Sequence, residues 1–266
     1  MEVLIVECKL IHGDCITEMQ KLIDDGVKVD LILTDPPYGT TNCAWDNIIP
    51  FDDMWTCINQ ISNPTTPTVL FGAEPFSTRL RNSNFKNYRY DWIWSKSNPA
   101  SVGIGKYQPM RYHELISVFY EKWGQYYPQM IKRLSPRIKQ AQKNNYEFNS
   151  NTPDSVMNGC RNDTNNSANK YDPNYKLPST ILSFNTLKGG SKEKVDHPTQ
   201  KPVALLEYLI KTYTNENDTV LDFTMGSGST GVACLQTHRN FIGIELEEKY
   251  YKIAKERCKT YQTKLW

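Results

Sequence analysis

A pair of prolines, Pro36 and Pro37, limits the possible folds of this chain more than any other feature. They belong to the stretch 34–39, which follows an apolar run at 29–33 that is typical of a buried strand in a parallel sheet. Neither proline has an N–H to donate, so the sheet ladder cannot continue through them. The chain therefore becomes rigid and irregular at the end of a strand, where open α/β sheets bind ligands.

The residues around these prolines are suited to holding a flat base that carries an amino group. Asp35 provides a carboxylate, Pro36 a backbone carbonyl in a fixed position, and Tyr38 an aromatic ring. An Asp-Pro pair is also common in ordinary turns, and alone this stretch would favour that simpler interpretation.

Short apolar runs alternate with helical patterns in both halves of the chain, which predicts an α/β fold with a mostly parallel sheet. We expect strands at 3–11, 29–33, 68–71, 88–94, 115–120, 180–184, 219–221 and 241–244. We expect helices at 16–23, 51–61, 74–81, 203–213, 229–237 and 247–260. The pattern dissolves between about 124 and 176, where Asn, Gln, Tyr, Lys and Arg predominate. A structureless loop of that length is uncommon in a compact core, so an insertion or surface module is expected there.

Composition excludes several classes of protein. The seven cysteines are scattered without a C-x-x-C pair, which indicates reduced thiols and no structural zinc. No apolar run approaches the roughly 20 residues that span a bilayer, and the N-terminus lacks the pattern of a signal peptide. We therefore expect a cytoplasmic protein without a metal. The 31 basic residues nearly balance 29 acidic ones, so only their distribution can indicate nucleic acid.

A glycine-rich turn follows the expected strand at 219–221. Gly226, Gly228 and Gly231 spell G-x-G-x-x-G, and Glu245 ends the next strand, where an acid can bind a ribose. This pattern suits either NAD or S-adenosylmethionine, and a glycine turn can also serve only to pack a helix on a strand. The turn lies late in the chain, whereas the dinucleotide-binding turn follows a first strand, so its placement favours the methyl donor.

Taken together, these motifs resemble the β class of amino-directed DNA methyltransferases, many of which are site-specific adenine-N6 enzymes. Asp35-Pro36-Pro37-Tyr38 resembles their D-P-P-Y motif, and the glycine turn resembles their methyl-donor loop. The sequence H-P-T-Q-K-P at 197–202 lies between them, as in that class. The family commonly reads D-P-F-x-G-x-G, whereas Phe223 and Thr224 stand here in place of proline and phenylalanine. The aromatic packing beside the donor is therefore expected to differ.

The resemblance implies a Rossmann-like methyltransferase fold with a doubly wound sheet of the seven-stranded type and a permuted order of motifs. It implies a catalytic part at 1–123, a target-recognition insertion at 124–179 and a donor-binding part at 180–266. Asp35, Pro36, Pro37 and Tyr38 would be catalytic, with S-adenosylmethionine as the cofactor. The base would be flipped out of the duplex.

The donor site carries over residue by residue. Asp14 and Cys15 would lie beside the adenine, Asp222 near the methionine amino group, and Glu245 on the ribose. His197 would either orient its loop or touch the donor, and Lys201 would either approach the methionine end or be a solvated charge. The remaining residues implied for the donor site are Gln200, Phe223, Thr224, Gly226, Gly228, Ser229 and Thr230.

Basic and aromatic residues interleave between 106 and 143, a pattern typical of phosphate contacts with some stacking on bases. A solvated face is the simpler alternative. The expected DNA-binding residues are Trp45, Lys106, Arg111, Lys132, Arg133, Arg137 and Lys139. The expected partner is DNA; a monomer, a homodimer and a restriction-modification partner all stay open.

Three alternatives to methylation of adenine N6 in DNA remain at this point. An aspartate in the first motif position favours adenine over cytosine N4, by resemblance. Methylation of adenine in RNA uses the same chemistry. A catalytically silent nucleic-acid-binding partner would keep the fold without the reaction, although the intact Asp35 and glycine turn argue against it.

Overall fold

A computed structural model describes residues 6–40, 46–100, 103, 105–134, 174–187 and 189–262. The chain divides into two compact units, one formed by 1–127 with 180–266 and the other by 128–179. In the second unit the described residues include two short antiparallel strands, β6 (Ile131–Lys132) and β7 (Tyr175–Lys176).

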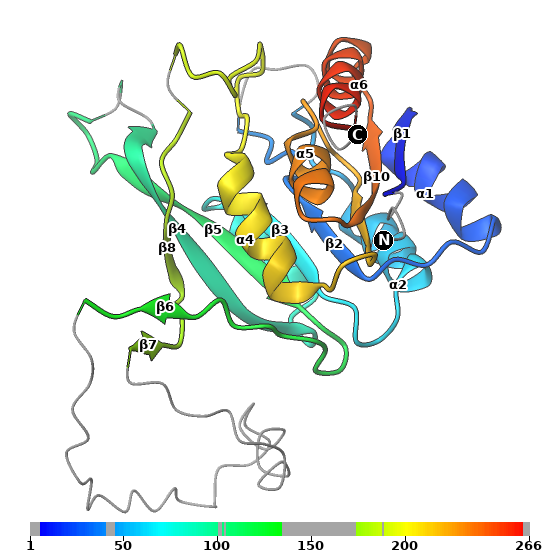
Figure 1. Cartoon of the computed structure of the whole chain (residues 1–266), viewed down its shortest axis with the longest axis horizontal. Helices are drawn as coiled ribbons and strands as arrows, with labels where there is room; N and C mark the ends of the chain where they lie inside the picture. Colours follow the sequence, from blue (N-terminus) through cyan, green and yellow to red (C-terminus); the bar gives the residue numbers. More distant parts are fainter. Residues whose placement is uncertain are drawn as a thin grey trace, which may run out of the picture. The chain divides into compact units, whose positions relative to one another are not determined.

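The first unit is built on one sheet of eight strands among the described residues (Figure 1). In spatial order these are β1 (Cys8–His12), β10 (Asn240–Glu245), β9 (Thr219–Asp222), β2 (Leu31–Thr34), β3 (Thr68–Gly72), β5 (Arg111–Phe119), β4 (Tyr88–Ala100) and β8 (Ile181–Ser183). Neighbours are parallel from β1 to β3, antiparallel on both sides of β5, and parallel again between β4 and β8. The predicted α/β class with a mostly parallel sheet is confirmed, with β8 as an eighth strand at one edge.

Helices cover both faces of this sheet, because alternate residues of each buried strand point to opposite sides. Leu31 and Leu33 of β2 pack with Leu209 in one core, whereas Ile32 packs with Met19 in a second core. The first core is covered by α4 (Val203–Tyr213), α5 (Ser229–Gln236) and α6 (Glu248–Gln262), and α4 and α5 lie in front of the sheet in Figure 1. The second core is covered by α1 (Cys15–Asp24), α2 (Phe51–Ile61) and α3 (Phe76–Ser83).

Most predicted elements are present, but the antiparallel strands differ in length. The expected strands at 88–94 and 115–120 are observed as 88–100 and 111–119. Their added residues are polar and are held by backbone pairing between β4 and β5, which a hydrophobic pattern does not signal.

The order of strands gathers four loops at one edge of the sheet. β2 and β9 are neighbours in the sheet. After β2 the chain forms β3 on one side of this pair, and after β9 it forms β10 on the opposite side. Such a reversal opens a crevice at the carboxyl ends of the strands. Asp14, Asp35, Asp222 and Glu245 end or follow four parallel strands, so they meet at this crevice.

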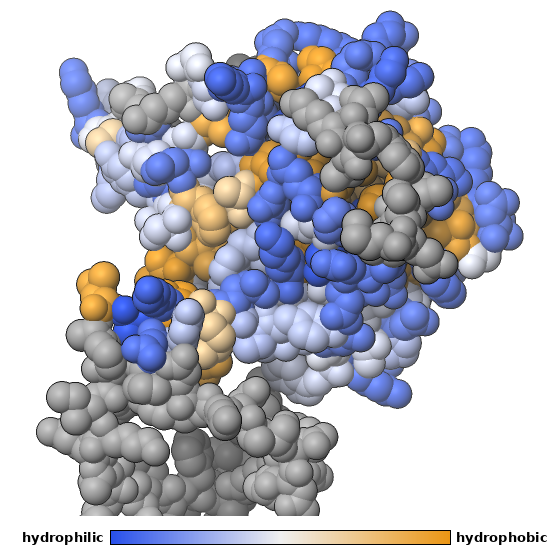
Figure 2. Space-filling model, in the orientation of Figure 1, coloured by the Kyte–Doolittle hydropathy of each residue, from blue (hydrophilic) through white to orange (hydrophobic). Residues whose placement is uncertain are grey.

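The visible surface is predominantly hydrophilic, with hydrophobic surface beside β8 (Figure 2). Ile181 of that strand is 56% exposed, while the next residue, Leu182, is buried against the sheet. Within the described residues, no helix combines the length and apolarity that crossing a membrane requires.

Candidate active site

A single cleft of about 660 Å³ lies at the crevice between β2 and β9. It brings together segments that lie far apart in the sequence, from the D-P-P-Y loop (34–39) to the glycine loop (222–231). The predicted site residues that line it are Asp14, Cys15, Asp35, Pro36, Pro37, Tyr38, His197, Gln200, Lys201, Asp222, Phe223, Thr224, Gly226, Ser229, Thr230 and Glu245. Gly228 packs behind the loop, against Ala254. A Cβ on Gly228 would lie only 2.8 Å from the Cβ of Ala254, so there is no room for a side chain.

The D-P-P-Y loop is held rigid by contacts at both of its ends. The Tyr38 hydroxyl donates to Oδ1 of Asp35 at 2.5 Å, and the Tyr38 ring stacks on Phe76 with centroids 4.9 Å apart. Asp46 accepts the backbone N–H groups of Gly39 and Thr40, both at 2.9 Å. Asp46 is buried, and sequence reasoning missed it because its partners are backbone groups.

Asp35, Lys201, Glu114 and Lys96 form one group of four charged side chains, which we call the carboxylate–lysine cluster. The Lys201 ammonium group pairs with Oδ2 of Asp35 and lies 3.4 Å from Oε2 of Glu114. Lys96 pairs with the other oxygen of Glu114. No sequence pattern indicates Glu114 or Lys96, since their pairing depends on partners from distant segments.

The cluster shifts the pKa of its members. Burial raises the pKa of Asp35, and the ion pair with Lys201 opposes that shift. Burial would also raise the pKa of Glu114, but Lys201 and Lys96 together lower it. The two carboxylates raise the pKa of Lys201 against the effect of its burial.

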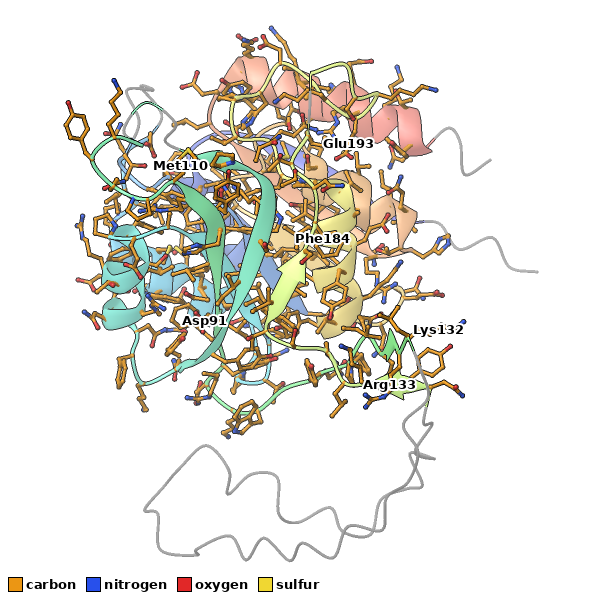
Figure 3. The ribbon with its side chains drawn as sticks, turned by 90° about the vertical axis from the view of Figure 1, so that its left-hand side faces the viewer. Asp91, Met110, Lys132, Arg133, Phe184 and Glu193 are labelled. Atoms are coloured by element: carbon orange, nitrogen blue, oxygen red, sulfur yellow. The ribbon has the colours of Figure 1, made fainter. Side chains whose placement is uncertain are left out.

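Lys201 and Gln200 therefore differ from the sequence-based expectation. Lys201 is buried and its ammonium group faces two carboxylates, which excludes a solvated charge. One of these carboxylates is that of Asp35 in the D-P-P-Y loop. The Gln200 amide accepts from the backbone N–H of Val195 and donates to the Glu193 carbonyl, both at 2.9 Å. Glu193 lies in the loop beside α6 (Figure 3), so Gln200 braces that loop rather than extending freely toward a donor.

Asp222 is the centre of a hydrogen-bond network that joins the ends of β2 and β9. Its two carboxylate oxygens accept from the hydroxyls of Thr34 and Thr230, each at 2.6 Å. Burial raises the pKa of Asp222 to about 6, although these hydrogen bonds oppose the shift. A buried carboxylate is thus held at the start of the glycine loop.

Thr224 connects the glycine loop to the catalytic motif. Its hydroxyl lies 2.6 Å from the Thr34 hydroxyl and donates to the Asp35 carbonyl at 3.1 Å. A phenylalanine in this position, which is common in the family that the motifs resemble, could not make these contacts. Phe223 turns away into the second core, where it is almost fully buried.

The glycine loop closes against Glu245. The N–H of Gly226 donates to Oε2 of Glu245 at 2.8 Å, and the N–H of Glu247 donates to Oε1 at 2.8 Å. Gly226 has φ +52°, and a Cβ there would lie 2.8 Å from Nε2 of His197. This backbone conformation and close approach explain the requirement for glycine.

Arg257 of α6 supports the same loop from the other side. Its Nη1 donates to the Ser227 carbonyl at 2.7 Å and lies 3.1 Å from the hydroxyls of Ser227 and Ser229. Nothing in the sequence pattern of the last helix distinguishes this arginine from a solvated one.

The remaining walls of the cleft come from α1 and from the loop before α4. Oδ1 of Asp14 caps α1 by accepting from the Thr17 N–H at 2.9 Å, and burial raises the pKa of Cys15 to about 12. Burial, with Lys201, Lys194 and Arg257 nearby, lowers the pKa of His197 to about 4, so its ring is neutral at physiological pH. That ring packs edge-on against Tyr250 with centroids 4.4 Å apart.

The predicted DNA-binding residues are dispersed. Lys106 is exposed, whereas Arg111 donates to the Glu74 carbonyl at 3.1 Å. Lys132 and Arg133 extend from the β6 region of the second unit (Figure 3), and Arg133 donates to the Tyr175 carbonyl at 3.0 Å. Trp45, Arg137 and Lys139 lie outside the described residues.

With this geometry established, a family model described as DNA methylase matches residues 29–256. The chain belongs to the DNA methylase family. Among curated relatives, the type II methyltransferase M.HpaI of Haemophilus parainfluenzae is 29% identical over 94% of this chain and 73% of its own length. The DNA adenine methyltransferase YhdJ of Escherichia coli is 25% identical over 93% of this chain and 81% of its own.

Solved structures agree with this assignment. The complex of M1.HpyAVI with SAM has a TM-score of 0.61 and 27% identity over 94% of this chain and 99% of that one. The cytosine-N4-specific PvuII DNA methyltransferase has a TM-score of 0.63 over 97% of this chain and 92% of its own. Its 13% identity shows a shared fold only.

Proposed function

We propose that this protein transfers a methyl group from S-adenosylmethionine to the N6 amino group of adenine in DNA, with the target base outside the duplex. The observation that carries the proposal is one cleft containing both the D-P-P-Y loop and the glycine loop. The names of the relatives support it: YhdJ is a DNA adenine methyltransferase, M.HpaI is a type II methyltransferase, and M1.HpyAVI was solved in complex with SAM.

The residues of the glycine loop fit a donor of this kind. Gly226 leaves a space that a Cβ would fill, and Glu245 presents a buried carboxylate beside it that suits two ribose hydroxyls. We assign Asp222 to the amino group of the methionine part, and Asp14 and Cys15, which also line the cleft, to the adenine. His197 contributes a neutral ring next to Gly226.

The target amine is a poor nucleophile because its lone pair is delocalised into the base. The Asp35 carboxylate and the Pro36 carbonyl would accept its two hydrogens and draw the nitrogen toward a tetrahedral shape. S-adenosylmethionine, held by the residues of the glycine loop, would supply an electrophilic methyl group and leave as S-adenosylhomocysteine. Asp35 or water would take the proton that the amino nitrogen releases on methylation.

The base must leave the duplex to reach Asp35, which costs a few kcal/mol. Stacking of the base on an aromatic ring can return about 1–3 kcal/mol. Tyr38 is the candidate ring, and its contacts with Phe76 and Asp35 fix its orientation before a base arrives.

The reaction is tested with labelled S-adenosylmethionine, mixed DNA and RNA, and analysis of the modified nucleosides. We expect label in N6-methyl-2′-deoxyadenosine from DNA; label in N4-methyl-2′-deoxycytidine or in any nucleoside from RNA would contradict the proposal. Replacing Asp35 by Ala should lower turnover about a hundredfold or more while donor binding persists. Asp196→Asn is the matched control, since that side chain is exposed and pairs with the exposed Lys249.

A further inference from the structure

Resting on the proposed function, we propose that Lys201 and Glu114 are positioning residues that hold the Asp35 carboxylate in its orientation and in its ionised form. Neither residue needs to touch the base or the donor in this role. Lys201 acts directly on Asp35, and Glu114 acts through Lys201.

The geometry fixes both oxygens of the Asp35 carboxylate. Oδ1 accepts from the Tyr38 hydroxyl, and Oδ2 accepts from the Lys201 ammonium. These contacts come from different segments of the chain, so the carboxylate plane cannot rotate without breaking one of them. An acceptor held in this way is already oriented when the target amine arrives, and preorganisation of this kind is a large part of catalysis.

Lys201 is itself held in place by its surroundings. It precedes α4 directly, and its ammonium lies 5.1 Å from the centroid of the Phe71 ring. Glu114 reaches the same ammonium from β5 and is in turn paired with Lys96 of β4. Burying a lysine ammonium group costs free energy unless carboxylates compensate its charge. An ammonium group that faces two carboxylates of the cleft therefore indicates a specific role.

The cluster is balanced, with two carboxylates against two ammonium groups. Removing Lys201 leaves two adjacent carboxylates facing one remaining cation, which favours the protonated form of Asp35. Removing the charge of Glu114 leaves Lys201 paired with Asp35 and no longer shared with a second carboxylate, which favours the ionised form of Asp35. The other titratable groups near the cluster are Tyr38, Asp46, Asp222 and His197. Lys201 also lowers the pKa of His197, so that pKa rises too in Lys201→Met, and the ¹³C carboxyl resonance of Asp35 distinguishes the two titrations.

The test compares the pH dependence of kcat/KM for methylation in the wild type, Lys201→Met and Glu114→Gln. The acid limb, where Asp35 takes up a proton, should move to higher pH in Lys201→Met and to lower pH in Glu114→Gln. A shift of about one pH unit or more is expected in each direction. Lys201→Arg keeps the charge and should restore the limb toward its wild-type position.

Opposite shifts of the acid limb in the two variants distinguish this role from a merely structural one. Loss of a structural role would lower kcat/KM without moving the acid limb. Glu207→Gln and Lys211→Met are the controls, because this ion pair lies on α4 and neither residue lines the cleft. A common direction of shift, or no shift, would overturn the proposal.

A variant too slow to assay is examined by the ¹³C carboxyl resonance of Asp35 in the full-length protein, assigned with Asp35→Asn. The titration midpoint should move in the same opposite directions without any turnover. An inactive wild type would instead contradict the proposed function, so the two failures are distinguishable.

Discussion

At the scale of single residues, the buried carboxylate of Asp222 lowers the stability of the folded protein when it is ionised. Its pKa is raised from 3.8 to about 6 in the folded protein, so between these pH values the folded state binds more protons than the unfolded state. Its contribution to stability therefore falls as pH rises through that window, by about 3 kcal/mol in total.

Asp222→Asn should remove this dependence, because asparagine does not titrate. Urea unfolding of both proteins at several values between pH 4 and pH 7 measures it. The free energy of unfolding of the wild type, relative to the variant, should decrease as pH rises. A difference that stays constant across the window would show that the carboxylate is not destabilised by burial.

Gly226 gives a second prediction at this scale. Gly226→Ala should weaken donor binding at least tenfold, because its φ is +52° and the added methyl group would meet His197. Calorimetric titration with S-adenosylmethionine measures the effect. Gly26→Ala is the control: Gly26 also has a positive φ, +75°, but nothing lies within 4 Å of its added methyl group. It should cost about 1 kcal/mol of stability and leave donor affinity unchanged.

The residues that sequence reasoning found and those it missed differ in one physical respect. Asp35, Gly226 and Glu245 were found because each stands at a fixed offset from a strand or a turn. Glu114 and Lys96 were missed because only tertiary pairing brings their charges together. Long-range ion pairs leave no period in a sequence, so a pattern cannot reveal them.

At the scale of elements, local pattern defines helices better than antiparallel strands. The bounds of α2 and α4 coincide with the predicted ranges, since their apolar residues recur at helical spacing. The ends of β4 and β5 do not, because their polar residues are held by ladder hydrogen bonds rather than by burial. The position of β8 beside β4 also depends on pairing between distant segments.

Helix α6 supports the glycine loop through Arg257, so we expect it to affect donor binding. Arg257→Met should raise the KM for S-adenosylmethionine several-fold with little change in kcat, because it loosens the glycine loop in both ground and transition states. It should also lower stability by about 1–3 kcal/mol, since the Ser227 carbonyl loses its donor. Steady-state kinetics and urea unfolding measure the two effects. Lys255→Met, exposed on the same helix, should change neither; an equal effect there would contradict the role of Arg257.

At the scale of the whole molecule, the two ends of the chain build the first unit and the middle forms the second. The residues that line the cleft all belong to the first unit. We infer that the second unit contributes target recognition, in line with the insertion expected at 124–179. Its basic residues include Lys132 and Arg133 (Figure 3).

The strand pair β6–β7 allows this division of labour to be tested by excision. Lys132 lies directly opposite Tyr175 in an antiparallel pair, so a two-residue Asn-Gly turn can join them and replace 133–174. The shortened protein should bind S-adenosylmethionine as the wild type does, because every residue assigned to the donor remains. Its affinity for DNA should fall at least tenfold, with a shallower dependence on salt, since basic residues are removed. Calorimetry for the donor and fluorescence anisotropy for labelled DNA at several salt concentrations measure both. Unchanged DNA affinity would place recognition in the first unit, and loss of donor binding would show that the units do not act separately.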